Sequence, residues 1–85
     1  MIIDRSESFK RAYHALPQEI QDRVKKTLLL FAENPRHPSL GHKKMEGAEG
    51  IWELRVTQNY RMTYHRIPGG IFLRRVGTHD ILRRP

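Results

Sequence analysis

The sequence predicts an α+β fold in which an N-terminal helical hairpin packs on a small antiparallel β-sheet, in the order β-α-α-β-β-β. Three observations lead to this prediction. Apolar residues before position 34 recur at helical spacing, and from position 51 onward the spacing changes to two. Two turn signals then divide the second half into three strands. With 85 residues, the chain has the length of a single domain, spanning positions 1–85.

The N-terminal part is expected to hold a short strand at positions 1–3 and then two helices. Ser6 is suited to the N-cap of the first helix, and apolar residues follow at helical spacing: Phe9, Tyr13 and Leu16. Pro17 ends this helix and suits the first turn of the next. The second helix has one apolar stripe and stops at positions 34–35; the stripe consists of Ile20, Val24, Leu28 and Phe31.

Positions 35–50 are predicted to form a loop, because they contain two prolines and three glycines. A loop of this length in so small a domain is usually functional. It also carries a basic run, His42-Lys43-Lys44, which could bind backbone phosphate. A solvated run of charge without any ligand is an equally good interpretation of these three residues.

Three strands are expected after position 51, with turns at 58–59 and 68–70, so that they form an antiparallel meander. The face predicted to cover the helices consists of Trp52, Leu54, Val56, Met62 and Tyr64. The opposite face, expected to be exposed to solvent, consists of Glu53, Arg55, Arg61, Thr63 and His65. The third strand, at 71–76, alternates less regularly, and its pattern does not assign Arg74 and Arg75 to either face.

The basic residues gather in the second half of the chain. The net charge is +7, and positions 35–85 alone hold ten basic and four acidic residues, eight of the ten being arginine. Arginine matches phosphate oxygens with two parallel hydrogen bonds, so this surplus indicates RNA, DNA or an acidic protein as partner. The alternative is a surface whose charge serves only solubility, but solubility does not require the charge to be segregated.

Several classes of protein are disfavoured by what the sequence lacks. It has no cysteine, which excludes disulfides and thiolate chemistry and fits a reducing cytoplasm. Neither a signal peptide nor an apolar run long enough to cross a bilayer is visible, so we expect a protein with no membrane association. No histidines or acidic residues stand at metal-ligand spacing, and we expect neither a metal nor another cofactor.

Arg55 and Arg61 are the strongest candidates for a catalytic pair. Both are predicted on neighbouring strands of the polar face, where their guanidinium groups could converge and stabilise the negative charge of a phosphorane. For Arg55, an ion pair with Glu53 on the same face is an equally good structural explanation. His79 follows Gly77 at the end of the last strand and could move a proton to or from a ribose hydroxyl. A histidine that only caps a turn is the alternative.

The second half resembles the RelE/ParE superfamily of bacterial toxins. The resemblance rests on positions 50–56 (GIWELRV), 59–64 (NYRMTY) and 76–80 (VGTHD), on a loop that ends KMEG at 44–47, and on the preceding helical hairpin. It covers nearly the whole chain and implies the RelE-like fold. The RelE branch cuts mRNA, commonly on the ribosome, whereas the ParE branch poisons DNA gyrase.

The resemblance also implies roles for individual residues. In the YafQ-type branch a histidine just after Gly-Thr takes part in RNA cleavage, which carries over to His79, and the arginine of the Tyr-Arg-x-x-Tyr strand carries over to Arg61. The expected RNA-binding residues are His42, Lys43, Lys44, Arg74 and Arg75. The chain departs from RelE itself at Ile51 and Glu53, where RelE has lysines, and it shows no counterpart of RelE's catalytic tyrosine near the C-terminus.

These observations lead to the hypothesis of a metal-independent mRNA endoribonuclease, the toxin of a type II toxin–antitoxin pair. The ribose 2′-hydroxyl would attack the adjacent phosphate and leave a 2′,3′-cyclic end, with Arg61 and Arg55 holding the phosphorane and His79 moving the proton. The expected partners are a cognate antitoxin, mRNA on or off the ribosome, and operator DNA only through the antitoxin. The alternatives are a non-catalytic gyrase inhibitor and an inactive member that binds only antitoxin or DNA.

Overall fold

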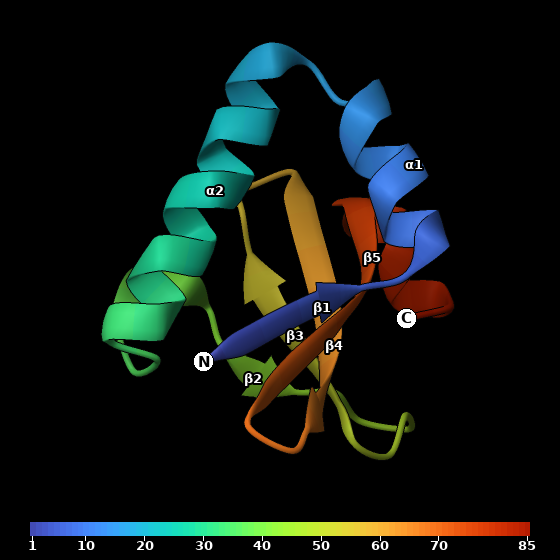
Figure 1. Ribbon diagram of the computed structural model, residues 1–85. Coiled ribbons are helices and arrows are strands. Elements are labelled where there is room, and N and C mark those ends of the chain that lie inside the picture. The colour runs from blue at the N-terminus through green and yellow to red at the C-terminus, as the bar shows by residue number, and fades with distance from the viewer.

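The computed structural model describes all 85 residues and contains two helices packed on one face of a five-stranded sheet (Figure 1). The elements follow the chain in the order β1 (Ile2–Arg5), α1 (Glu7–Ala15), α2 (Gln18–Glu33), the 3₁₀ turn η1 (Pro38–Leu40), β2 (Lys43–Lys44), β3 (Ile51–Arg55), β4 (Tyr60–Ile67), β5 (Gly70–Thr78) and the 3₁₀ turn η2 (His79–Arg83). The predicted α+β fold is confirmed. None of its helices has the length and apolar character needed to cross a membrane.

The sheet is larger than the predicted meander and is mixed. Its strand order is β1-β5-β4-β3-β2, and β3, β4 and β5 form the expected antiparallel meander. The prediction of a purely antiparallel sheet is wrong, because β1 pairs in parallel with β5. Gly70 permits this pairing: a Cβ there would lie 1.8 Å from the carbonyl oxygen of Ile2. The loop also contributes a strand, since Lys43 and Lys44 pair with β3 at the other edge.

The helical hairpin forms at the positions that the sequence predicted. Ser6 is the N-cap of α1: its hydroxyl accepts a hydrogen bond from the Phe9 amide at 2.9 Å and donates one to the Arg74 carbonyl at 2.7 Å. Helix α1 is thus fixed to β5 at its first turn. Of the predicted stripe of α2, Val24 and Phe31 are buried in the core, and the other two pack against it.

The core lies between the hairpin and the sheet. The predicted helix-facing residues Leu54, Val56, Met62 and Tyr64 are all buried, whereas Trp52 is half-buried at the edge of the core. This distribution confirms the strand register that the two-residue alternation predicted.

The opposite sheet face is not as exposed as predicted. Thr63 is fully buried and Glu53 is 6% exposed, so the expectation of a solvent-exposed face is wrong at these two positions. The C-terminal segment folds back across β4 and β5, where the Pro85 carbonyl oxygen accepts hydrogen bonds from the Thr63 hydroxyl at 3.0 Å and from Arg74 Nε at 3.1 Å. The C-terminal segment, which has no strand or helix periodicity in the sequence, therefore covers part of this face of the sheet.

A β-bulge explains the irregular alternation of β5. Thr63 pairs with Arg75 but its neighbour Tyr64 pairs with Leu73, so Arg74 has no partner across the ladder. The flanking Leu73 and Val76 are both buried against the helices. Arg74 and Arg75 consequently share the face away from the hairpin, an arrangement that strict alternation forbids and a bulge allows.

Candidate functional site

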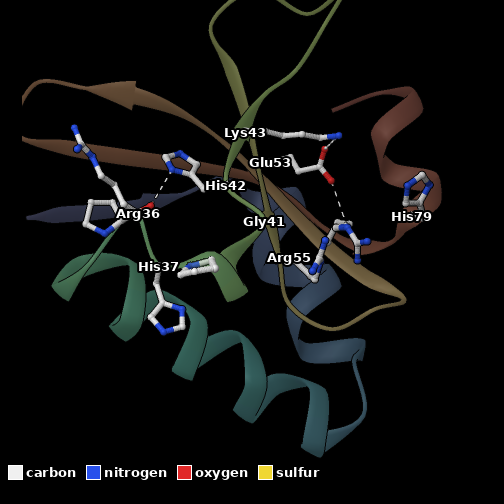
Figure 2. A pocket seen from close by; sticks show the side chains of 11 residues that line it. Arg36, His37, Gly41, His42, Lys43, Glu53, Arg55 and His79 are labelled. Carbon is white, nitrogen blue, oxygen red and sulfur yellow. Dashed lines mark hydrogen bonds and ion pairs between the residues drawn. The ribbon is translucent and has the colours of Figure 1, made fainter.

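A polar pocket of about 520 Å³ opens beside the exposed part of the sheet, between the loop before β2, the strands β3 and β4, and the start of η2 (Figure 2). None of its lining residues carries an aliphatic side chain other than the proline rings. The residues that line it are Pro35, Arg36, His37, Pro38, Gly41, His42, Lys43, Glu53, Arg55, Arg61 and His79. We refer to this hollow as the polar pocket.

Glu53 is the one carboxylate in the polar pocket, and both its oxygens are engaged (Figure 2). Oε1 lies 3.7 Å from Lys43 Nζ, and Oε2 lies 3.3 Å from Arg61 Nε. The ion pair that the sequence left open between Glu53 and Arg55 is not formed; Arg61 takes that place. The two flanking cations offset the charge of Glu53 within the pocket.

Arg61 is held by the strand turn as well as by Glu53. Its Nη1 donates to the carbonyl oxygens of Thr57 at 2.5 Å, Gln58 at 2.8 Å and Tyr60 at 3.1 Å. Nη1 is thus hydrogen-bonded to backbone carbonyls and Nε is ion-paired with Glu53, whereas the two N–H groups on Nη2 have no partner. Arg61 is therefore a fixed group that can offer one edge to a ligand.

Arg55 contrasts with Arg61, although the two lie directly opposite each other on β3 and β4. Arg55 is exposed and makes no ion pair or side-chain hydrogen bond. Its side chain crosses Gly41, where a Cβ would lie 3.2 Å from Arg55 Cβ and 3.3 Å from its Nε. Gly41 also has a φ of 52°, which favours glycine. The Arg55 guanidinium is thus supported by backbone while all its donors stay free.

His79 lies at the end of β5, as the first residue of η2, and lines the polar pocket. It is exposed, and no hydrogen bond joins its ring to Asp80 or to any other residue. The sequence led us to expect that this histidine and the two arginines could act together, and the structure brings all three to one pocket.

His42 has a structural environment that the sequence did not reveal. Its Nδ1 lies 3.2 Å from the Pro35 carbonyl oxygen, its Nε2 lies 2.5 Å from the Tyr64 hydroxyl, and its ring packs between Phe31 and Trp52. Burial lowers the pKa of His42, and the nearby Arg66 lowers it further, against the opposing effect of the Pro35 hydrogen bond. His42 therefore anchors the loop as a neutral ring.

The other predicted RNA-binding residues are spread over different surfaces. Lys43 lines the polar pocket, but its neighbour Lys44 pairs with Trp52 at the sheet edge and does not. Arg74 also lies outside the pocket, where it bonds to Pro85 and, from Nη1, to His65 Nδ1 at 2.8 Å. Arg75 is exposed and likewise lies outside the pocket.

Sequence reasoning missed two residues of the polar pocket, Arg36 and His37. They stand in a short run with proline on either side, Pro35 and Pro38, which was the only signal of a stiff segment. No periodicity connects them to the strands. Their place in the lining of the polar pocket follows from the path of the loop, which only the folded chain reveals.

The lining as a whole is suited to an anion. The lining holds four cationic residues, Arg36, Lys43, Arg55 and Arg61, and one carboxylate, which is paired with Lys43 and Arg61. Fixed positive groups in a hollow raise the local concentration of anionic ligands. No group of three histidine, cysteine, aspartate or glutamate residues is placed to hold a metal ion.

Comparison with known proteins identifies the fold. Neither a protein-family model nor a curated protein matches the sequence. Among solved structures, YafQ from Escherichia coli strain BL21(DE3) superposes with a TM-score of 0.79 at 16% identity, over 95% of this chain and 96% of that one. The RelB–RelE antitoxin–toxin complex from Methanococcus jannaschii gives 0.74 at 20% identity, over 94% of each chain.

A further neighbour is the YoeB/ParE toxin from Agrobacterium tumefaciens, with a TM-score of 0.77 at 15% identity, over 93% of this chain and 99% of that one. At such identities the likeness defines the fold and leaves the chemistry to be argued from the site. The chain has the RelE-like fold that its sequence motifs predicted.

Proposed function

We propose that this chain is the toxin of a toxin–antitoxin pair and that it cuts mRNA without using a metal ion. The observation that carries the proposal is the meeting of the free Arg55 guanidinium, the open edge of Arg61 and the unpaired His79 ring in one cationic pocket. Transfer of a phosphodiester to a ribose hydroxyl needs proton transfer and stabilisation of the phosphorane charge, which an imidazole and two arginines can supply. The fold shared with RelE, YafQ and YoeB/ParE structures supports this assignment.

In the proposed reaction the ribose 2′-oxygen attacks the adjacent phosphorus, and the bond from phosphorus to the 5′-oxygen of the next nucleotide breaks. The products are a 2′,3′-cyclic phosphate and a free 5′-hydroxyl. His79 takes the proton from the 2′-hydroxyl and returns it to the leaving 5′-oxygen. Arg55 and Nη2 of Arg61 meet the charge that develops on the phosphorane oxygens.

Arg55, rather than Arg61, is the principal phosphate ligand in this proposal. All five of its N–H groups are free, whereas Arg61 already gives three of its own to Glu53 and to backbone carbonyls. Lys43 Nζ, 3.7 Å from Glu53, adds charge at the same edge. The antitoxin would then neutralise the toxin by covering this cationic face with an acidic or amphipathic segment in the bacterial cytoplasm.

The alternative is a non-catalytic inhibitor of DNA gyrase, which the likeness to a YoeB/ParE toxin keeps open. A gyrase inhibitor needs neither a free imidazole nor an open arginine fork. The deciding experiment adds purified protein to in vitro translation and maps mRNA 5′ ends by primer extension, beside a gyrase supercoiling assay. New mRNA ends support the ribonuclease, while supercoiling inhibition without new ends would replace it.

A further inference from the structure

A second hollow, of about 600 Å³, adjoins the polar pocket at the pair Arg55 and Arg61. It opens between helix α2, η1 and the turn that joins β3 to β4, and we refer to it as the second hollow. Three arginines line it, Arg23 together with that pair, and no acidic residue does. Because Arg55 and Arg61 line both spaces, the polar pocket continues at this pair into a hollow whose charged residues are all cationic.

Arg23 reaches the second hollow from helix α2 and is held against the end of β3. Its Nη2 donates to the carbonyl oxygen of Val56, the residue directly after β3, at 3.5 Å. Nη1 of Arg61 donates to the carbonyl oxygen of the next residue, Thr57, at 2.5 Å. The guanidinium groups of Arg23 and Arg61 therefore lie against two consecutive carbonyl groups of one segment, and Arg55 immediately precedes that segment.

The Arg23 guanidinium keeps most of its donors free. Its bond to Val56 is long and uses one of five N–H groups, and no other hydrogen bond or ion pair engages the group. Glu19 lies four residues earlier on α2, at the spacing that favours an ion pair, yet it forms none with Arg23. Fastening α2 to the end of β3 needs only the one N–H, so it does not account for the free donors.

The backbone that carries Arg23 is fixed by the core. Val24, the next residue of α2, is 1% exposed, and the Thr27 hydroxyl donates to the Arg23 carbonyl oxygen at 2.8 Å. A long side chain on so fixed a backbone, already held at its tip, loses little further conformational entropy when it binds a ligand. Because arginine matches phosphate oxygens with two parallel hydrogen bonds, Arg23 is suited to bind phosphate in the second hollow.

We propose that Arg23 provides a second phosphate subsite, in the second hollow, which binds the phosphodiester next to the scissile one in a single-stranded RNA. The inference rests on the proposed function and extends it: the substrate is a strand that passes the pair Arg55 and Arg61 and lies in both spaces. The pair holds the scissile phosphate where the two spaces meet, and Arg23 binds the neighbouring phosphate with no carboxylate in the lining to oppose it. Such contacts fix the position of the RNA backbone and do not read its bases.

The test measures binding of RNA oligomers with 2′-O-methyl riboses, which cannot be cut, to wild type and to Arg23→Ala. A tetranucleotide has a phosphodiester on either side of its middle one, whereas a dinucleotide has a single phosphodiester. With the tetranucleotide, Arg23→Ala is expected to bind about tenfold more weakly than wild type and to lower the salt slope by about 0.7. With the dinucleotide the two proteins are expected to bind alike, because Arg55 and Arg61 hold its one phosphate.

The matched control is Arg11→Ala, which removes an exposed arginine of α1 that makes no ion pair and lines neither space. It is expected to bind both oligomers as wild type does. The urea midpoints of Arg23→Ala and Arg11→Ala should agree, because the 3.5 Å bond to Val56 is the one side-chain hydrogen bond that the loss of Arg23 removes. If Arg23 only fastened α2 to the strand, its loss would weaken binding of both oligomers equally or of neither.

The outcomes separate this inference from the proposed function. If the oligomer binds with the expected dependence on length but mRNA is never cut, the subsite stands and the ribonuclease fails. If mRNA is cut while Arg23→Ala binds the tetranucleotide as Arg11→Ala does, the ribonuclease stands and the subsite is overturned. Equal weakening for the dinucleotide and the tetranucleotide, or no binding of either by wild type, also overturns the subsite.

Discussion

Nε of Arg61 lies 3.3 Å from Oε2 of Glu53, a carboxylate whose side chain is only 7% exposed, and the Arg61 side chain is itself 13% exposed. Arg61 thus has a structural as well as a chemical task. Arg61→Lys is expected to destabilise the fold by about 2–3 kcal/mol, because a lysine cannot bond Glu53 and the turn carbonyls together. Urea unfolding would measure this loss.

The control for that measurement is Arg55→Lys. Arg55 makes no intramolecular hydrogen bond, so the same substitution there should change the unfolding free energy by less than about 0.5 kcal/mol. Equal stability of the two variants would contradict the structural role of Arg61. The activity of Arg61→Lys must therefore be compared with that of wild type at the same fraction of folded protein. A loss of activity in Arg55→Lys needs no such correction, and it reports directly on the two-pronged contact between arginine and phosphate.

The strand register can be tested with a pair of leucines. Leu54 is fully buried between β3 and the hairpin, whereas Leu29 on α2 is 67% exposed. Leu54→Ala should cost about 2–5 kcal/mol from lost transfer energy and an unfilled cavity. Leu29→Ala should stay within about 0.5 kcal/mol. Thermal or urea unfolding of both variants checks this, and similar costs at the two positions would show that the register is wrong.

Because the His42 ring is neutral in the folded chain, the free energy of unfolding depends on pH. Its Nδ1 carries the proton toward the Pro35 carbonyl, and its Nε2 accepts from the Tyr64 hydroxyl at 2.5 Å. Because the pKa of His42 is lower in the folded chain than in the unfolded chain, the unfolded chain binds this proton more readily. The contribution of His42 to folding stability is therefore full above about pH 6.5 and is lost as the pH falls through the folded pKa. Protonation also places a cation near Arg66.

Urea midpoints measured between about pH 8 and about pH 5 would report this loss of folding stability at low pH. Wild type should weaken toward the acid end, and His42→Gln should weaken less over the same range because it has no proton to gain there. His14→Gln, at an exposed histidine of α1, is the control and should follow wild type. The same acid slope in His42→Gln as in wild type would contradict the burial effect.

Local patterns predicted most of the fold because they encode burial directly. The N-cap at Ser6, the stripe of α2 and the alternation of β3 and β4 all formed as expected. What the sequence missed depends on contacts between distant segments. The parallel pairing of β1 requires Gly70, 68 positions after Ile2, and the bulge at Arg74 breaks the alternation on which strand assignment relies.

The site was predictable to a similar degree. Arg55 and Arg61 follow from strand register, and the three predicted catalytic residues do meet in one pocket. The partner of Glu53 could not be chosen, since Arg55 two residues away and Arg61 across the ladder satisfy the same pattern. The position of His42 in an aromatic cluster, and of Arg36 in the pocket, depends on how a loop without periodicity crosses the sheet.

Gly41 connects the loop to the proposed chemistry. Gly41→Ala would place a methyl group 3.2–3.4 Å from three atoms of Arg55 while forcing a residue with a Cβ to φ 52°. We expect a loss of about 1 kcal/mol in unfolding free energy and a larger relative loss of RNA cleavage, because the Arg55 fork must move. Gly47→Ala has a similar positive φ of 73° but open space around it, so it should lose stability without the extra loss of cleavage.

His79 provides the most direct test of the proposed mechanism. Its ring is exposed and makes no hydrogen bond, so His79→Ala should leave the circular dichroism spectrum and the urea midpoint unchanged. Cleavage, by contrast, should fall by about 10²–10⁴-fold, the usual contribution of a general acid or base. Binding of an uncleavable RNA should persist, because the cationic groups that hold phosphate are all retained.

The measurement for His79 compares growth arrest and mapped mRNA 5′ ends for wild type, His79→Ala and Asp80→Asn. Since no hydrogen bond or ion pair joins Asp80 to the His79 ring, Asp80→Asn should cut like wild type and serves as the matched control. Undiminished cutting by His79→Ala would assign the proton transfer elsewhere. Lys43, which also lines the polar pocket and lies 3.7 Å from Glu53, would then be the next residue to replace, because its ammonium can exchange a proton.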